Sequence, residues 1–345
     1  MKVGVIGIGD IADIYLKNIT YKFDNISVQA VCNRTREKAE AAWKKYKVPK
    51  LYDTMEELLA DQDIDIVLNL TRPNEHYEVT KAALLAGKHV YTEKPLAATL
   101  KEGKELIALA GEKGLRIAGA PDTFMGAGIR TCKKLLEDGA IGEPVGAAAF
   151  MLCRGHEHWH PNPEFYYKQG GGPMLDMGPY YLTTMITLLG RVKGVTGRTK
   201  TSFPERIISS QPKAGQKIDV EVPTYVTGIM DFESGAIGTF FTTFDVHSKH
   251  QARFEVYGSE GTLFVPDPNT FGGPVSIYRQ GANQVTEMPL LFDYAENSRG
   301  LGLSDMADAI RENRKAAAGE NQLLHVAEVM EAFEISSEKK GYVRL

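Results

Sequence analysis

The chain begins with an apolar run that leads directly into a glycine turn: Met1-Lys2-Val3-Gly4-Val5-Ile6-Gly7-Ile8-Gly9-Asp10-Ile11-Ala12. The apolar run predicts a buried strand, and helical periodicity follows over about residues 10–19. Gly7 permits a tight turn, Gly9 allows another group to approach the backbone closely, and Ala12 is small enough for helix and strand to pack together. This order is typical of the first unit of an open parallel sheet.

Short apolar strands alternate with helical patterns through the first third of the chain, as in repeated βαβ units. The alternation changes at Ala120-Pro121-Asp122, so we expect a first α/β domain over residues 1–121. Its expected strands are 2–6, 27–32, 65–70, 88–92 and 115–119, and its expected helices are 10–19, 35–46, 54–60, 75–86 and 99–113.

Beyond residue 121 the expected strands lengthen, and turns at 233–235 and 258–261 are typical of hairpins. Residues 122–345 therefore predict a mostly antiparallel α+β domain, with C-terminal helices that pack back on the body. The expected strands are 145–154, 192–202, 220–232, 235–245, 252–257 and 261–265, and the expected helices are 125–138, 173–189, 303–316 and 322–337.

Composition narrows the class of protein. A length of 345 residues favours two domains, and a net charge of -4 argues against nucleic acid as a partner. No apolar run reaches membrane-spanning length, and a strand at the very start leaves no room for a signal peptide. The three scattered cysteines form no disulfide framework. We therefore expect a cytoplasmic protein with no membrane partner.

The glycine turn predicts a dinucleotide site. The N-terminus of a helix offers free N–H groups and a positive dipole end to a pyrophosphate. The alternative is a turn that merely connects strand and helix. The residues expected to contact the cofactor here are Gly7, Gly9, Asp10 and Ile11.

The end of the second strand bears on the choice between NAD and NADP. NAD sites usually place a carboxylate there, but this strand ends in Asn33, Arg34 and Thr35. A guanidinium and a hydroxyl suit a 2′-phosphate, so the sequence favours NADP. The alternative is that Arg34 stacks on adenine and that either NAD or NADP binds.

Lys94 is the best single indication of chemistry. It follows an apolar strand in Val90-Tyr91-Thr92-Glu93-Lys94-Pro95. The carboxyl ends of the strands of an open parallel sheet surround its ligand crevice, so a lysine there can reach a bound nicotinamide. Lysine is an uncommon residue to bury, because its ammonium group must be desolvated or paired. The alternative is a surface lysine at the start of the next helix.

These motifs together resemble the Gfo/Idh/MocA oxidoreductases, named for glucose–fructose oxidoreductase and inositol dehydrogenase. The resemblance covers nearly the whole chain and rests on Gly7-x-Gly9-x-x-Ala12, Thr71-Arg72-Pro73-Asn74-Glu75-His76, the segment 86–95, and the segment 170–181. It implies a Rossmann domain followed by an α+β domain with a large open sheet, which in relatives often forms the dimer face. It also implies cofactor contacts from Thr71, Arg72, Pro73, Asn74, His76, Glu93 and Lys94.

The resemblance implies a catalytic role for Lys94 and for the segment that contains Asp176. Many relatives carry Asp-x-x-x-His there, whereas this chain has Asp176 followed by Tyr180, as in a tyrosine-containing branch of the family. Residues four apart share one face of a helix, so both groups can point into one cleft. We expect Lys94 and Tyr180 to transfer the proton, with Asp176 orienting the substrate or holding Lys94. The alternative is that Tyr180 and Tyr181 fill a helix–sheet interface.

A histidine-rich loop, Arg154-Gly155-His156-Glu157-His158-Trp159-His160-Pro161, borders the predicted substrate pocket. Alternate histidines can ligate a metal, but a span this short needs further ligands, and we expect none. Hydrogen bonds and a flat apolar face for a polyhydroxylated ring fit better, and an oligomer contact is the alternative. The residues expected to contact substrate are Lys94, Asp122, Arg154, His156, His158, Trp159, Tyr166, Asp176 and Tyr180.

The sequence thus favours an NAD(P)-dependent dehydrogenase or reductase that acts on a sugar, cyclic polyol or related carbohydrate. We expect a homodimer or homotetramer formed through the C-terminal sheet. Two other classes stay open: a redox-neutral glycoside hydrolase that retains NAD, and a non-catalytic sensor that binds the cofactor as a ligand. The presence of Lys94 and Asp176 disfavours the sensor, which has no chemical need for them.

Overall fold

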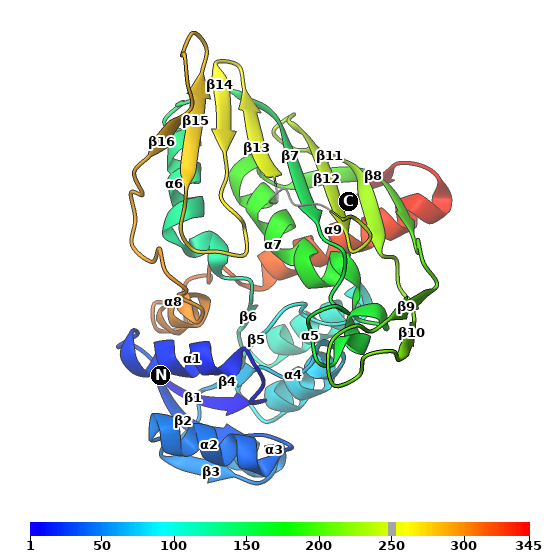
Figure 1. The fold of residues 1–345 in the computed structure, drawn as a ribbon. Coiled ribbons are helices and arrows are strands. Elements are labelled where there is room, and N and C mark those ends of the chain that lie inside the picture. Colours follow the sequence, from blue (N-terminus) through cyan, green and yellow to red (C-terminus); the bar gives the residue numbers. More distant parts are fainter. Residues whose placement is uncertain (248–252) are drawn as a thin grey trace. The chain divides into compact units, whose positions relative to one another are not determined.

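The computed structural model describes residues 1–247 and 253–345, which form two compact units (Figure 1). The first unit comprises Met1–Met125 with Asn297–Leu324, and the second comprises Gly126–Glu296 with His325–Leu345. The predicted boundary at residue 121 lies just before the observed one. The predicted second domain is interrupted, however, because residues 297–324 return to the first unit.

The first unit contains a six-stranded parallel sheet in the order β3-β2-β1-β4-β5-β6, which confirms the predicted Rossmann architecture. Its strands are β1 (Lys2–Ile6), β2 (Ser27–Cys32), β3 (Lys50–Tyr52), β4 (Ile66–Asn69), β5 (His89–Thr92) and β6 (Ile117–Gly119). Its helices are α1 (Ala12–Tyr21), α2 (Arg36–Tyr46), α3 (Met55–Ala60), α4 (His76–Leu85), α5 (Leu100–Glu112) and α8 (Leu301–Arg311). The sequence did not predict the short edge strand β3.

Local signals explain where two of these helices, α3 and α5, begin. Thr54 precedes α3, and its side chain accepts a hydrogen bond from the Glu57 N–H at 3.2 Å. Thr99 does the same for the Glu102 N–H at the start of α5, also at 3.2 Å. In both cases the glutamate side chain bonds back to the threonine N–H, so each helix starts with a capping box.

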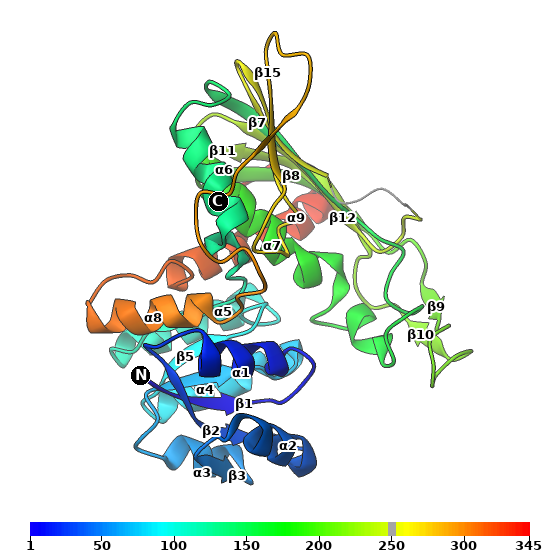
Figure 2. The same cartoon turned by 60° about the vertical axis from the view of Figure 1, so that its left-hand side comes forward.

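The second unit contains a nine-stranded sheet in the order β16-β15-β14-β13-β7-β12-β11-β8-β17 (Figure 2). Only β7 and β12 pair in parallel among its described strands, which confirms the predicted mostly antiparallel sheet. The strands are β7 (Pro144–Leu152), β8 (Val192–Lys200), β11 (Tyr225–Phe232), β12 (Ile237–Thr243), β13 (Arg253–Gly258), β14 (Gly261–Phe264), β15 (Val275–Arg279), β16 (Thr286–Met288) and β17 (Val343–Arg344). Residue 252 of the predicted strand 252–257 lies outside the described residues.

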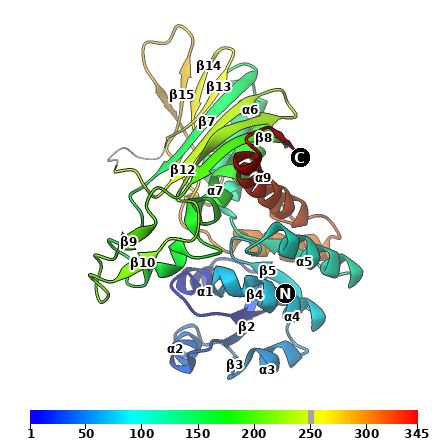
Figure 3. The same ribbon diagram turned by 90° about the vertical axis from the view of Figure 1, so that its right-hand side faces the viewer.

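Three further α-helices of the described residues are α6 (Ala127–Glu137), α7 (Gly172–Leu189) and α9 (Glu320–Lys339), and α9 runs beside β8 (Figure 3). Phe333 of α9 packs on Phe240 of β12 with 5.6 Å between ring centroids. The helix approaches β8 so closely that a Cβ on Gly197 would lie 2.9 Å from Phe333. A separate two-stranded sheet pairs β9 (Glu205–Ile207) with β10 (Lys217–Asp219), which the sequence did not predict.

The nine-stranded sheet leaves apolar side chains exposed on β11 and β12, among them Ile229 and Ile237 at 48% and 55% exposure. Self-association through this sheet stays a prediction. Among the described residues, no helix combines the length and the apolar character needed to cross a membrane.

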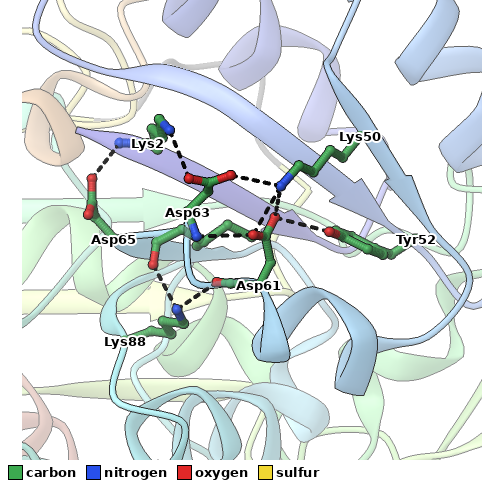
Figure 4. A network of polar contacts seen from close by, with 8 residues as sticks. Lys2, Lys50, Tyr52, Asp61, Asp63, Asp65 and Lys88 are labelled. Carbon is green, nitrogen blue, oxygen red and sulfur yellow. Dashed lines mark hydrogen bonds and ion pairs between the residues drawn. The ribbon is translucent and has the colours of Figure 1, made fainter.

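A polar network ties together the amino ends of the strands in the first unit (Figure 4). Lys50 at the start of β3 donates to Asp61 at 2.8 Å and to Asp63 at 3.0 Å, and Lys2 of β1 donates to Asp63 at 3.1 Å. Lys88, which precedes β5, is buried and donates to the carbonyls of Asp61 and Ile64 at 2.7 and 2.9 Å. Because this edge is occupied by structural contacts, the opposite, carboxyl edge is the one available for a ligand.

Candidate active site

The glycine turn connects β1 to α1. Gly7 has a φ of +99°, which favours glycine, and a Cβ at this position would lie 2.7 Å from the Leu70 carbonyl. The Cβ position of Gly9 has open space around it. Beside the turn is an open groove of about 300 Å³, lined in part by Gly9, Asp10 and Lys38. The turn therefore fits a pyrophosphate placed against the N-terminus of α1.

Asn33, which directly follows β2, forms a hydrogen bond with the glycine turn. Its Oδ1 accepts the Ile8 N–H at 2.8 Å, and its Nδ2 donates to the Thr35 carbonyl at 2.9 Å. The side chain that the sequence assigned to the cofactor is thus engaged within the protein, where it links the glycine turn to the backbone at Thr35.

Arg34 meets a carboxylate that the sequence did not place at the end of β2. Its Nη1 lies 3.0 Å from Oε1 of Glu75, although the Arg34 side chain is 77% exposed. Glu75 belongs to the segment after β4, and its other oxygen accepts the Arg72 N–H at 3.4 Å. A carboxylate therefore does stand beside Arg34, supplied from a different strand end.

The segment after β4 is held by Asn69 and His76. Asn69 accepts the Thr71 hydroxyl at 2.6 Å and donates to the His76 carbonyl at 3.2 Å. The ring nitrogens of His76 lie 2.7 Å from the Pro95 carbonyl and 3.0 Å from the Thr71 carbonyl. Burial lowers the pKa of His76, so the neutral ring carries one N–H and donates to one of these carbonyls. The His76 ring therefore lies between a carbonyl of the loop after β4 and a carbonyl of the loop after β5, and it bonds to one of them.

Lys94 follows β5 and is positioned by its neighbour Glu93. The buried Glu93 carboxylate accepts hydrogen bonds from the backbone N–H of Lys94 at 3.0 Å and from the Tyr15 hydroxyl at 2.8 Å. Tyr15 lies on α1 and is itself fully buried. Glu93, which was predicted as a cofactor contact, is thereby linked to α1, the helix that follows the glycine turn. Lys94, two residues after the end of β5, lies at the carboxyl edge of the sheet.

Asp122 was predicted to contact substrate, but its carboxylate is engaged with the backbone that starts α8. Its Oδ2 accepts the N–H groups of Gly300 and Gly302 at 2.9 and 3.0 Å, and the side chain is 1% exposed. Burial raises the pKa of Asp122 to about 6, against the opposing effect of these two N–H groups. We therefore leave Asp122 out of the substrate site proposed below.

Asp176 and Tyr180 lie one turn apart on α7, as the spacing predicts. The Asp176 side chain is 18% exposed and Tyr180 is 5% exposed. The neighbouring Tyr181 is buried and stacks on Phe254 with 6.3 Å between ring centroids. Burial raises the pKa of Tyr181, so this tyrosine has the character of a core residue.

The histidine-rich loop brings His156 to Asp176. Nε2 of His156 lies 3.3 Å from Oδ2 of Asp176, and both belong to the second unit. The His156 ring packs on Tyr166 with 4.0 Å between centroids, and Trp159 Nε1 donates to its Nδ1 at 3.1 Å. His156, Trp159, Tyr166 and Asp176 therefore form one cluster of the predicted substrate contacts.

Other predicted contacts in this loop are placed differently. Arg154 and His158 are exposed, and no described contact joins either of them to Asp176. Lys94 belongs to the first unit and Tyr180 to the second, so their pairing as proton donor and acceptor stays a prediction. Over residues 1–247 and 253–345, no three His, Cys, Asp or Glu side chains group closely enough to hold a metal ion.

Several supporting residues were missed in the sequence: Tyr15, Asn69, Glu75, Glu157 and Arg206. Arg206 lies on β9, where its Nη1 is 3.0 Å from Glu157 Oε1 and its Nη2 pairs with Asp245. Glu75 and Glu157 stand inside motifs that the sequence singled out, so their position was a usable signal. Tyr15 and Arg206 carry no such signal, because their partners are distant in the chain.

Two family models match the chain. Residues 1–119 match "Oxidoreductase family, NAD-binding Rossmann fold", and residues 129–264 match "GFO/IDH/MocA C-terminal domain". The two matches correspond to the glycine-turn sheet and to most of the nine-stranded sheet.

Individual relatives share about a third or less of their residues with this chain over the aligned segments. An uncharacterised oxidoreductase of Schizosaccharomyces pombe is 35% identical over 212 residues, which is 58% of this chain and 55% of the relative. The chain thus spans little more than half the length of that relative. The 1,5-anhydro-D-fructose reductase of Ensifer adhaerens is 29% identical over 247 residues, 70% of this chain and 69% of the relative. A solved levoglucosan dehydrogenase in complex with NADH and levoglucosan shares the fold, with a TM-score of 0.83 at 21% identity over 100% of this chain and 99% of that one.

The raised pKa of Asp122 predicts a specific pH dependence of stability. The folded state binds the proton more tightly than the unfolded chain, whose aspartates titrate near pH ~4. The stabilising contribution is therefore complete below about pH 4 and is lost as the pH rises through about 6. The free energy of unfolding of the wild type should fall over this range relative to Asp122→Asn, which does not titrate. Urea denaturation at several pH values measures the difference, and a difference that stays constant or grows with pH contradicts the prediction.

Proposed function

Because the chain belongs to the Gfo/Idh/MocA oxidoreductase family, we propose that it is an NAD(P)-dependent dehydrogenase or reductase that acts on a CH–OH group of a sugar, cyclic polyol or related carbohydrate. The observation that carries the proposal is Lys94, held at the carboxyl edge of a glycine-turn sheet by Glu93. The anhydro-sugar reductase of Ensifer adhaerens supports the substrate class. The Tyr180 of α7 supports a place in the tyrosine-containing branch of the family.

The aromatic surroundings of Asp176 suit such a substrate. His156 and Tyr166 pack on each other beside Asp176, and the neighbouring Trp159 offers a flat ring to the apolar face of a sugar. The Asp176 carboxylate offers a hydrogen-bond acceptor to a hydroxyl. The Trp159 side chain is 55% exposed, so its ring has surface left to cover.

The proposed chemistry divides between the cofactor and the chain. A bound nicotinamide supplies hydride transfer. The chain must remove the proton of the reacting hydroxyl in the oxidation, or return it in the reduction. We assign this proton to the Tyr180 hydroxyl, with the Lys94 ammonium stabilising the negative charge that develops on oxygen. Asp176 orients the substrate through another hydroxyl.

A substrate panel tests the proposed reaction. Aldoses, inositols and anhydro-sugars are supplied with NAD and with NADP, and nicotinamide absorbance is followed. A dehydrogenase reduces one nicotinamide for each substrate molecule consumed. Sustained glycoside cleavage without net change in absorbance would instead identify the redox-neutral hydrolase, and cofactor binding with no turnover of any substrate would favour the sensor.

We further propose a preference for NADP, supported by the exposed Arg34 guanidinium at the end of β2. Glu75 opposes this preference, because its carboxylate competes with a 2′-phosphate for Arg34. Arg34→Ala should weaken NADP binding by about tenfold and NAD binding much less, since only NADP carries the phosphate. Glu75→Gln should strengthen NADP binding.

Fluorescence titration gives the Kd of both cofactors for each of these variants. Lys44→Ala, which removes an exposed lysine of α2 paired with Glu40, is the matched control for a lost surface cation. Equal losses for both cofactors in Arg34→Ala, or a wild type that strongly prefers NAD, would overturn the assignment.

The proton-transfer assignment predicts a matched pair of tyrosine variants. Tyr180→Phe keeps the ring and its packing but deletes the hydroxyl, so kcat should fall by ~10² or more while cofactor binding is retained. Tyr181→Phe alters the adjacent core tyrosine and should be mild. Lys94→Ala should be comparably severe, and the double variant little worse, because residues that act as a unit are not additive. Near wild-type turnover in Tyr180→Phe refutes the assignment.

A further inference from the structure

His156 is held in the second unit by contacts that the proposed reaction does not require. It lies in the turn after β7 with a side chain that is 15% exposed. Its ring packs against Tyr166 and Phe244, with centroids 4.0 and 4.7 Å away. Packing against two rings leaves the imidazole little freedom to rotate.

Trp159 determines which ring nitrogen of His156 carries the proton. An indole N–H can only donate, and that of Trp159 lies 3.1 Å from Nδ1 of His156. Nδ1 must therefore be the unprotonated acceptor. In a neutral imidazole the single N–H then sits on Nε2.

The Nε2 of His156 faces Asp176. Nε2 lies 3.3 Å from Oδ2, which is close enough for an ion pair, but among the described residues this buried nitrogen makes no hydrogen bond of standard geometry. A small shift of either group turns this contact into a hydrogen bond, and such a shift is favoured because a buried donor without a partner is costly. The ring thus presents a donor to the carboxylate while Trp159 prevents the opposite tautomer.

Hydrogen bonds to the backbone of His156 and Glu157 also hold this turn in place. The Tyr167 hydroxyl accepts the His156 N–H at 3.2 Å and donates to the Glu157 carboxylate. Glu157 also pairs with Arg206 at 3.0 Å. The Glu157 carbonyl accepts the N–H groups of Ser209 and Ser210 at 2.8 and 3.1 Å. The loop between β9 and β10 therefore holds the turn on the side of Glu157, and His156 is directed toward α7.

We propose that His156 is a positioning residue that fixes the orientation of the Asp176 carboxylate through its Nε2–H. The proposal rests on the proposed function, in which Asp176 orients the substrate. A carboxylate held in one orientation presents its acceptor to a substrate hydroxyl at a defined place, and small misplacements of such a group reduce the rate strongly. Tyr180 keeps the proton-transfer role, and His156 acts through Asp176.

A pair of substitutions separates positioning from packing. His156→Phe keeps a flat ring but removes the donor, whereas His156→Gln loses the ring but keeps an N–H at the position of Nε2. We expect His156→Phe to lower kcat/KM by about tenfold or more, and His156→Gln to recover much of the loss. The Kd for the cofactor should stay at the wild-type value in both. A His156→Phe enzyme more active than His156→Gln would show that the ring only fills space and would overturn the proposal.

A double-variant cycle tests whether His156 acts through Asp176. Adding His156→Phe to Asp176→Asn should cause little further loss, because the carboxylate to be oriented is already gone. Losses that multiply would mean that His156 acts independently of Asp176, which contradicts the proposal. Thermal unfolding of each variant confirms that the second unit is intact.

Nitrogen NMR of isotopically labelled histidine tests the same arrangement without turnover. The His156 resonances, assigned by their loss in His156→Gln, should report the Nε2–H tautomer at neutral pH. Trp159→Phe should shift them toward a mixture of tautomers, because the donor to Nδ1 is removed. An Nδ1–H tautomer in the wild type overturns the proposal. Since this readout needs no substrate, it separates a failure of the positioning role from a failure of the proposed reaction.

Discussion

The carboxyl edge of the first unit depends on how closely the chain packs around Gly7. The Gly7 N–H donates to the Cys32 carbonyl of β2 at 3.0 Å, while a Cβ on its other side would lie 2.7 Å from Leu70 after β4. Any side chain would separate the ends of β1 and β4. Because these ends meet, the turn, the Arg34 segment and the Thr71 segment share one edge. Glycine is therefore needed at position 7 so that the ends of β1 and β4 can pack together, independently of any bound cofactor.

Polar side chains at this edge are used mainly to fix the backbone. Asn33, Asn69 and Glu93 all lie at or just beyond strand ends, and each binds N–H, hydroxyl or carbonyl groups of the loop that follows its own strand. Polar groups removed from water must form hydrogen bonds within the protein, and these hydrogen bonds give the loops a defined geometry. The consequence is preorganisation, because the Glu93 carboxylate fixes the backbone at Lys94 and links it to Tyr15 of α1.

The sequence predicted those features that repeat or lie close together in the chain. Strand and helix periodicity identified the parallel sheet, and the four-residue spacing of Asp176 and Tyr180 identified a shared helix. Contacts between segments that are far apart in the chain could not be predicted from periodicity or residue spacing. Asp122 meets backbone 178 and 180 residues further on, and nothing local marks it as the partner of α8. The sequence also missed the strands β3, β9, β10, β15, β16 and β17. Five of these have only two or three residues, which carry little periodicity, and β15 with five residues was missed as well.

The charged cluster beneath the His156 turn has a different physical basis from the hydrogen bonds of the first unit. The Arg206 side chain is 10% exposed and lies between Glu157 and Asp245, whose side chains are 14% and 5% exposed. Removing three charges from water is expensive, and well-packed apolar residues often give equal or greater stability. Apolar contacts lack direction, however, whereas a guanidinium donates to carboxylates only along its fixed N–H vectors. We infer that the cluster serves the orientation of the turn more than the stability of the unit, since the residue next to Glu157 is the one that faces Asp176.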